Sequence, residues 1–478
     1  MITRLQVLTE DEKNQVHERT LRILAQTGVR VDTARGRQIL KSAGAEVNDN
    51  TRVVRFPQSL VEEAIRLVPK NFTLCARRPG WDLDMNGGDC KLLLSGEGTS
   101  TLDRKTGKHR DSTFDDWLEA TRLADALDDI GLYWRIVQAT DRQDNVAEYT
   151  DYLVSLFRNF SKHVQDPIYS KEQAPWFLEV LQTVFGPREI IRQRHPVSYV
   201  LCPQSPLVID EIYTDAYFEL IGWNIPVALM PMPLTGATAP ASQIATVIMA
   251  NCEILATLCL VEAAEPGVPV IYAPVSAPMD PRSGLVKSGA VESNALSAAS
   301  AEMARYYGLP AEISGLGTGR FIPDVQSGYE RAMRTLQSVL SWPDIIVGAG
   351  MLGGAMILSL EQMVIDAEIF RICKHAHRGI VCDNDKWLDD VIERVGPGGH
   401  FLDQPSTASA VRSKEWFENR LGINTAFEDW QDAGRPDIVA EAREKVDQIL
   451  TMHQPLPLEE EADRELDRIR KRASESVA

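Results

Sequence analysis

A repeated order of short apolar run, loop and helix constrains the fold of this chain most strongly. Residues 227–230 form an apolar run typical of a buried strand, a loop rich in Pro, Thr and Gly follows, and apolar residues then recur at helical spacing over 244–260. The same order recurs at 268–273, which leads into an alanine-rich helical run over 289–303. Parallel α/β folds have this alternation, and they bind ligands at the carboxyl ends of their strands.

Eight strands of this kind are expected, each separated from the next by enough chain for a helix. They are residues 91–94, 132–137, 163–164, 197–201, 227–230, 270–273, 312–314 and 345–347. Eight strands with helical crossovers predict an α/β fold of the (β/α)8 (TIM) barrel type. We expect an N-terminal α/β extension packed on the barrel (1–90), the barrel (91–355), a C-terminal helical extension (356–455) and a charged tail (456–478).

Charge and composition narrow the partners of the chain. The net charge of −18 argues against a surface for nucleic acid or anionic membranes. No segment is expected to span a membrane, because the longest candidate, 244–264, carries Asn251, Glu253 and Glu262. The polar start (1–14) does not resemble a signal peptide. Seven scattered cysteines without a CxxC pair indicate reduced thiols and a cytoplasmic protein.

The sequence shows no motif for a metal site, a nucleophile elbow or a P-loop. His375 and His377 are two residues apart, so on a helix they point to different faces, and we interpret them as exposed. The glycine-rich turns 315–319 and 348–350 can cradle an anion, but a tight barrel loop explains them equally well. No metal ligand is therefore predicted.

Polar and aromatic residues follow the predicted strands, where a barrel places its active site. Rings combined with carboxylates suit an alkylammonium ligand through cation–π contact, and an arginine there can pair with a carboxylate. Loop caps, salt bridges and ordinary core packing explain the same residues. The candidates are Glu97, Asp103, Gln138, Asp141, Gln204, Thr235, Ser276 and Arg320, with the rings of Tyr133, Trp134, Tyr272 and Phe321.

Several segments in order resemble the trimethylamine methyltransferase superfamily, over residues 10–450. They are 230–240 (MPMPLTGATAP), 273–274 (AP), 305–310 (RYYGLP), 323–330 (PDVQSGYE), 348–352 (GAGML), 366–368 (DAE) and 396–402 (GPGGHFL). An earlier pattern of Asp103, Thr106, Gly107, Arg110, Thr113 and Asp116 is similar too.

The resemblance implies a (β/α)8 barrel that transfers a methyl group from a methylamine to the cobalt(I) of a corrinoid (cobalamin). A small separate corrinoid protein carries that cofactor and docks over the barrel mouth, so no tightly bound cofactor is expected in this chain. Founding members use pyrrolysine, whereas every position here is a standard residue. The chain therefore looks like the branch that demethylates quaternary amines such as glycine betaine, proline betaine or carnitine.

A quaternary substrate releases a neutral tertiary amine, so no acid–base residue is predicted and the protein mainly supplies position and a dry site. From the strand ends we expect a substrate pocket with Arg320 on a betaine carboxylate, and a set of residues that faces the corrinoid. The substrate residues are Glu97, Trp134, Gln204, Tyr272 and Arg320. The corrinoid-facing residues are Thr235, Gly236, Gly348 and Gly350.

Two departures from the family pattern leave alternatives open. No histidine stands beside the turn at 347–350, and residues 403–409 (DQPSTAS) replace a histidine-rich run that many members carry. The alternatives are a non-catalytic quaternary-amine binding or regulatory barrel, trimethylamine as the substrate, and a barrel enzyme of unrelated chemistry. Barrel enzymes of this size often assemble, so a homo-oligomer is expected.

Overall fold

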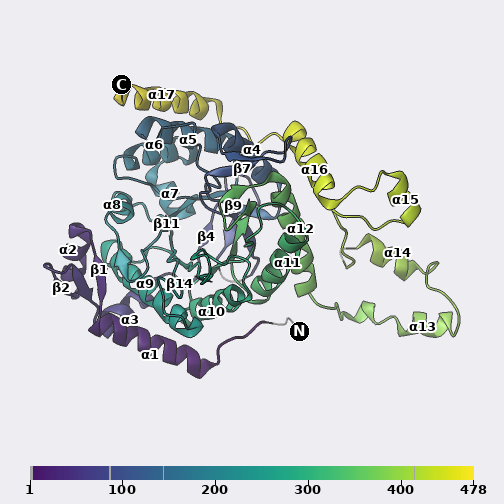
Figure 1. The fold of residues 1–478 in the computed structure, drawn as a ribbon, viewed down its shortest axis with the longest axis horizontal. Coiled ribbons are helices and arrows are strands. Elements are labelled where there is room, and N and C mark those ends of the chain that lie inside the picture. The colour runs from purple at the N-terminus through teal and green to yellow at the C-terminus, as the bar shows by residue number, and fades with distance from the viewer. Residues whose placement is uncertain (1–3, 86–87, 144, 414, 478) are drawn as a thin grey trace.

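A closed parallel barrel forms the centre of the computed structural model, which describes residues 4–85, 88–143, 145–413 and 415–477 (Figure 1). Its strands in chain order are β6 (Lys91–Leu94), β9 (Ile130–Tyr133), β10 (His163–Gln165), β11 (Val197–Leu201), β13 (Val227–Leu229), β15 (Val270–Tyr272), β17 (Glu312–Ser314) and β18 (Ile345–Ala349). β18 pairs with β6, and a parallel bridge from Tyr272 to Ala311 joins β15 to β17. The predicted (β/α)8 barrel and all eight strands are confirmed.

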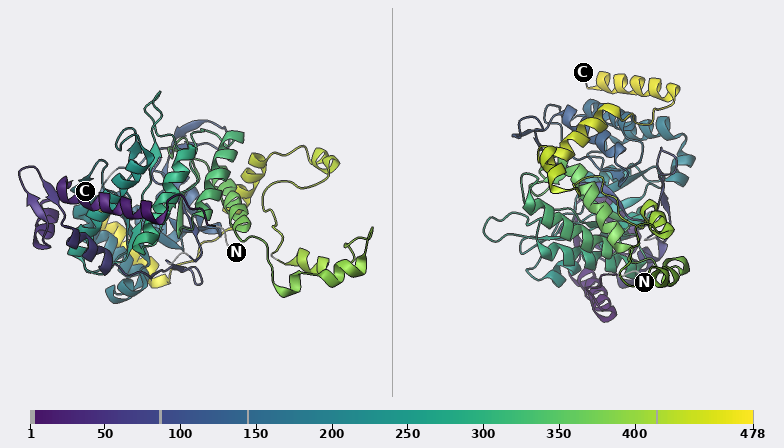
Figure 2. Two further views of the ribbon diagram at one scale, coloured as in Figure 1. Left: turned by 90° about the horizontal axis from the view of Figure 1, so that it is seen from below. Right: turned by 90° about the vertical axis from the view of Figure 1, so that its right-hand side faces the viewer.

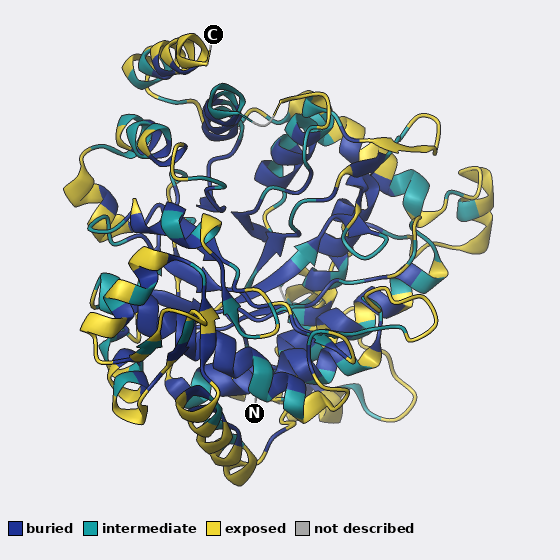
Figure 3. Cartoon of the chain, turned by 60° about the vertical axis from the view of Figure 1, so that its left-hand side comes forward, coloured by how far each residue is buried: buried dark blue, intermediate teal, exposed yellow. Residues whose placement is uncertain are grey.

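Helices surround the strands on the outside, so the buried residues lie at the centre (Figure 3). Side-chain caps fix where several helices begin: Thr113 forms a capping box with Asp116, and Asp324 forms one with Ser327. The helices are α4 (Phe114–Ala126), α5 (Val146–Asn159), α6 (Ala174–Phe185), α7 (Arg188–Arg194), α8 (Ile212–Phe218), α9 (Gln243–Ala264), α10 (Val291–Tyr307), α11 (Val325–Leu340) and α12 (Leu360–His377).

The strands are buried on both faces, which explains their continuous apolar runs. Alternate residues point to the helices or into the barrel: Leu92 packs in the outer core, whereas Leu93 belongs to an inner cluster with Leu132 and Val200. The hairpin β4 (Thr73–Leu74) and β5 (Leu83–Asp84) adds Leu74, Leu83 and Met85 to that inner cluster. It fills the barrel from the amino-terminal ends of the strands.

The N-terminal extension is joined to the barrel by a sheet and by the longest helix. Its elements are α1 (Glu10–Gln26), β1 (Val29–Val31), α2 (Ala34–Ser42), β2 (Glu46–Asn48), β3 (Val53–Arg55) and α3 (Gln58–Leu67), and β1 pairs with β12 (Val208–Ile209) of a barrel loop. α1, α2 and α3 pack on α9. α9 is long and apolar enough to cross a membrane, but 78% of its most apolar window is buried inside the protein, so packing accounts for its composition.

Two small sheets lie beyond the carboxyl ends of the barrel strands. One pairs β14 (Leu234–Thr235) with β16 (Ala277–Pro278), and the other has the order β19 (Met351–Leu352), β20 (Ile357–Leu358), β7 (Ser100–Leu102) and β8 (His109–Asp111). They shape the loops of the barrel mouth.

The C-terminal part forms a projecting arm and two packed helices. After α12 the chain leaves the barrel through η1 (Asn384–Lys386), α13 (Asp389–Val395), α14 (Pro405–Arg412) and α15 (Phe427–Asp432), which extend to one side (Figures 1 and 2). α16 (Ile438–Met452) returns to pack on α12 and α4. α17 (Glu460–Ser476) is charged but buries Leu466, Ile469 and Ala473 against α5 and α6, so the tail is a docked helix.

Candidate functional site

Glu97 connects three loops at the carboxyl ends of the strands. Its backbone is left-handed (φ 65°), which a non-glycine residue adopts only with support from its surroundings. That support comes from the backbone hydrogen bond of its N–H to Arg135 O (2.9 Å). Its carboxylate accepts hydrogen bonds from the Tyr169 hydroxyl (2.5 Å) and the Gln138 amide (3.1 Å). The half-buried carboxylate is therefore held in one position.

Trp134 lies inside the barrel close to Glu97. Its side chain belongs to the inner cluster, and its ring lies against Gly96, where a Cβ atom would come within 2.5 Å of ring carbons. Among the residues that the structure describes, its buried Nε1 has no hydrogen-bond partner. The interior below the mouth therefore holds a buried aromatic ring whose N–H donor is unpaired among the described residues, of which the sequence predicted only the ring.

A line of neutral polar groups crosses the barrel interior. The Ser198 hydroxyl lies 2.9 Å from His163 Nε2 and 3.1 Å from Gln165 Oε1, and the Gln165 amide donates to Glu312 Oε2 at 2.8 Å. Burial raises the pKa of Glu312 to about 8 and lowers the pKa of His163 to about 3. Both groups are therefore uncharged at neutral pH, and the interior offers hydrogen bonds without fixed charge.

Arg135 points away from Trp134 into an aromatic cavity between the strands and helices α4 and α5. Its guanidinium carbon lies 3.4 Å from the ring centroid of Tyr152 and 4.9 Å from that of Tyr169. The cavity has a volume of about 210 Å³. Phe114, Trp117, Tyr149, Tyr152, Tyr169 and Arg135 are among its lining residues. Arg135 was not among the residues predicted from the sequence, although the spacing of Tyr149 and Tyr152 by one helical turn was a visible signal.

Three of the expected substrate residues do not join Glu97 and Trp134. Tyr272 faces outward: its hydroxyl donates to Asn251 on α9 (3.0 Å), because strand alternation turns its neighbours Ile271 and Ala273 inward instead. Arg320 is already neutralised by Asp324, the N-cap of α11, at 2.7 Å from Nε. Gln204 is exposed, and its backbone pairs with Val208.

The expected corrinoid-facing glycines have different environments. A Cβ at Gly350 would lie 2.9 Å from Ile136 Cδ1, and a Cβ at Gly348 would lie 3.1 Å from Leu316 N, so both are needed for close packing of the barrel wall. Gly236 is exposed, with only Met279 Cε near its Cβ position, at 3.8 Å. Thr235 is buried, with its hydroxyl 2.8 Å from that of Thr246. Of the four, Gly236 leaves room for the approach of a flat ring system.

Exposed apolar side chains project from the loops after β13, β15, β17 and β18, and we call them the apolar rim. Hydrogen bonds from Gly353 to Arg320 O (2.7 Å) and from Gly354 to Thr318 O (2.9 Å) hold the last two loops together. Exposed apolar groups gathered on one face mark a contact surface for another protein. The rim consists of Met232, Leu285, Val286, Phe321, Ile322 and Met356, which are 45–69% exposed.

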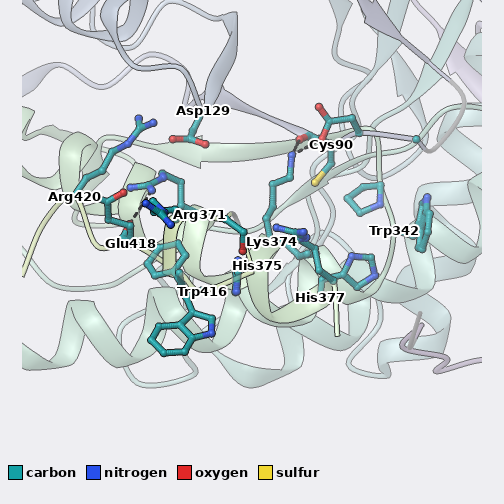
Figure 4. Close-up of a pocket in the computed structure, with 18 of the residues that line it drawn as sticks. Cys90, Asp129, Trp342, Arg371, Lys374, His375, His377, Trp416, Glu418 and Arg420 are labelled. Carbon is teal, nitrogen blue, oxygen red and sulfur yellow. Dashed lines mark hydrogen bonds and ion pairs between the residues drawn. The ribbon is translucent and has the colours of Figure 1, made fainter. Parts of the chain in front are cut away.

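A larger cavity of about 1070 Å³ lies at the opposite end of the barrel (Figure 4). Cys90, Asp129 and Trp342 line it, and they come just before strands β6, β9 and β18. His375 and His377 also line it and are half-buried, so their interpretation as exposed residues was wrong. Barrel enzymes use the carboxyl end of the strands for catalysis, so we place the functional site at the mouth.

Comparisons with known proteins give the family of the chain. The family described as trimethylamine methyltransferase (MTTB) matches residues 1–477. The trimethylamine methyltransferase MttB of Desulfitobacterium hafniense (strain DSM 10664 / DCB-2) is 31% identical over 452 residues, covering 95% of this chain and 90% of that protein. The glycine betaine methyltransferase of Desulfitobacterium hafniense (strain Y51) is 29% identical over 468 residues, which cover 98% of this chain and 96% of that protein.

A solved structure shows the same fold at low sequence identity. The monomethylamine methyltransferase MtmB of Methanosarcina barkeri superposes with a TM-score of 0.50 at 10% identity, over 97% of this chain and 92% of that one. The family match over nearly the whole length, together with the closed barrel, identifies the group of proteins. This chain belongs to the trimethylamine methyltransferase family.

Proposed function

We propose that the protein transfers a methyl group from a quaternary amine, glycine betaine or a close relative, to the cobalt(I) of a corrinoid carried by a separate protein. The observation that carries the proposal is the barrel mouth, whose loops carry the exposed apolar rim and whose interior holds the Trp134 ring and uncharged polar side chains. A methylammonium group needs such an aromatic surface, and a docked cofactor carrier needs such a rim. The 29% identical glycine betaine methyltransferase supports the same substrate class.

The corrinoid, when its carrier is docked, supplies the nucleophile that accepts the methyl group. The side chains of this protein bind and orient the amine and exclude water. Trp134 offers its ring face to the ammonium, and the fixed Glu97 carboxylate adds electrostatic attraction. The leaving group is a neutral tertiary amine, so the uncharged interior around Glu312 does not need to deliver a proton.

Gly236 and the apolar rim would contact the corrinoid protein. Thr235 would hold their loop in place through its hydrogen bond with Thr246. Gly348 and Gly350 would act indirectly, by allowing the wall of the mouth to close. We also propose a cytoplasmic location and assembly into a homo-oligomer. The seven free cysteines support the first, and the exposed apolar residues of the projecting arm support the second.

An anaerobic methyl-transfer assay tests the function. The protein is mixed with cob(I)alamin, free or on a corrinoid protein, and with glycine betaine, proline betaine, carnitine, choline or trimethylamine, and methylcob(III)alamin is followed by absorbance. Turnover with a quaternary amine is the expected result. Turnover with trimethylamine alone would reassign the substrate. Ligand binding without turnover on either form of the corrinoid would favour the non-catalytic binding protein.

A further inference from the structure

We propose that the aromatic cavity beside Arg135 binds the substrate, with the Arg135 guanidinium holding a carboxylate and the rings holding a quaternary ammonium. The substrate class is then a small carboxylated betaine, and not an amine that lacks a carboxylate. This inference rests on the proposed function. It replaces Arg320 with Arg135 as the carboxylate anchor, and it replaces Trp134 and Glu97 with the rings of this cavity as the ammonium site.

The guanidinium of Arg135 has unused hydrogen-bonding capacity. Its side chain is 11% exposed, and its Nε and Nη2 atoms are buried without a hydrogen-bond partner among the described residues. The nearest carboxylate oxygen, Asp166 Oδ2, lies 4.0 Å from Nη2, too far for a hydrogen bond. Leaving buried charged donors unpaired is costly, so a ligand carboxylate in this position would supply the missing partner.

The charge balance also favours an anionic group. Burial lowers the pKa of Arg135, but Tyr152, Tyr169 and Asp166 outweigh it and raise the pKa well above its usual value, so the guanidinium stays charged. Burial raises the pKa of Asp166 to about 7, so this carboxyl is only partly ionised at neutral pH. The positive charge of Arg135 is therefore not cancelled by its neighbour.

The rest of the cavity suits an ammonium group. The rings of Tyr149 and Tyr169 stand nearly perpendicular, at 80°, with their centroids 6.4 Å apart, and form two walls of an aromatic box. Gln138 and Tyr169 line the cavity and also hydrogen-bond to Glu97, so a carboxylate stands behind this wall. Arg142, the other lining cation, already pairs with Glu148 at 3.1 Å.

The size of the cavity selects a small ligand. Its volume is about 210 Å³, about a fifth of that of the 1070 Å³ cavity at the other end of the barrel. The lining residues belong to α4, whose first residue is Phe114, or to the segments that follow strands β9 and β10, so the cavity lies at the same end as the barrel mouth. A betaine fits this space, whereas a nucleotide does not.

The test compares ligands that differ in the carboxylate. Calorimetric titration of the wild-type protein with glycine betaine, choline and tetramethylammonium should give at least tenfold tighter binding of glycine betaine. This comparison needs no variant, so it holds even if substitutions at Arg135 impair folding. Equal or tighter binding of choline or tetramethylammonium, or no binding of glycine betaine, would overturn the inference.

The matched variants locate the carboxylate anchor. Arg135→Met should weaken the binding of glycine betaine at least tenfold and the binding of tetramethylammonium less than threefold. Arg135→Lys should restore part of the lost affinity for glycine betaine. Arg305→Met is the control, because this half-buried arginine bonds the Ser341 and Trp342 carbonyls and not the cavity. If Arg320→Ala weakens glycine betaine binding and Arg135→Met does not, Arg320 is the carboxylate anchor and the inference about Arg135 is refuted.

The methyl-transfer assay separates the two proposals. Turnover of choline without turnover of any carboxylated betaine would support the methyltransferase function and refute the carboxylate site at Arg135. Arg135-dependent binding of glycine betaine without methyl transfer to either form of the corrinoid would support the binding site and refute the methyltransferase function.

Discussion

At the scale of single residues, the mouth depends on one glycine beside one tryptophan. Gly96 allows the Trp134 ring to lie flat against the backbone, since any Cβ there would overlap ring carbons at 2.5 Å. The ring has no room to retreat, because it is buried in the inner cluster with Met230 and Val347. The position of the Trp134 ring is therefore set by the backbone of a neighbouring loop.

Gly96→Ala should displace the Trp134 ring and destabilise the protein by about 1–3 kcal/mol, as overpacked cores do. The intrinsic tryptophan fluorescence should change. Gly328→Ala is the matched control: its Cβ meets no atom within 4 Å and it lies within α11, so its stability should stay equal or rise slightly. Chemical unfolding of both variants measures the difference, and equal stability would contradict the packing argument.

Glu312 makes stability depend on pH. Its pKa is raised from 4.5 to about 8 in the folded protein, so the folded state holds this proton more tightly than the unfolded state does. The stabilisation is complete below the unfolded pKa and is lost as the pH rises towards about 8. Glu312→Gln keeps the acceptor for Gln165 and cannot ionise.

The expected outcome is that Glu312→Gln gains stability relative to wild type between pH 5 and pH 9, by an amount on the order of 3 kcal/mol. Urea unfolding of both proteins at each pH measures this gain. An unchanged difference between the two proteins across that range would show that Glu312 is already ionised in the barrel.

At the scale of elements, the order of strands and helices was readable from the sequence, and the directions of side chains were not. All eight strands are runs buried on both faces, a pattern that needs no tertiary information. Whether Tyr272 faces in or out depends on strand register, which a shift of one residue reverses. The pairing of Arg320 with Asp324 was visible as a spacing of four residues before α11, and it leaves Arg320 without a free charge.

The C-terminal helix supports the wall that carries the aromatic cavity. α17 packs on α5, which contributes Tyr149 and Tyr152 to that cavity. Leu466→Ala removes a fully buried side chain and should cost about 2–4 kcal/mol. Lys471→Ala, on the exposed face of the same helix, should change stability by less than about 0.5 kcal/mol. Thermal unfolding of the two variants compares them, and similar melting temperatures would show that α17 is not docked in solution.

At the scale of the whole molecule, the arm between α12 and α16 has too little core of its own. Its helices α13, α14 and α15 have only 7, 8 and 6 residues, lengths that are not stable alone in water. Ile392, Leu402 and Phe427 on this arm are 58%, 85% and 63% exposed. The sequence predicted a helical extension and a family segment at 396–402 here but not the projection, because distance from the barrel leaves no local signal.

We expect the arm to pack on a second copy of the chain. Sedimentation should then give a mass above the 53.2 kDa of one chain, and Ile392→Asp combined with Leu402→Asp should shift it towards one chain. Matched aspartate substitutions at the apolar rim, at Leu285 and Phe321, should leave the assembly unchanged and should instead weaken methyl transfer to the corrinoid protein. A monomeric wild-type protein would refute the assembly.

The hairpin that fills the barrel from below has a kinetic consequence. With Leu74, Leu83 and Met85 buried in the interior, the described part of the chain closes the barrel at the amino-terminal ends of its strands and leaves the mouth as the entrance. If the cofactor carrier covers that entrance, amine must arrive before docking and product must leave after undocking. Each catalytic cycle then includes one association and one dissociation of the carrier, so the lifetime of the complex sets an upper limit on turnover.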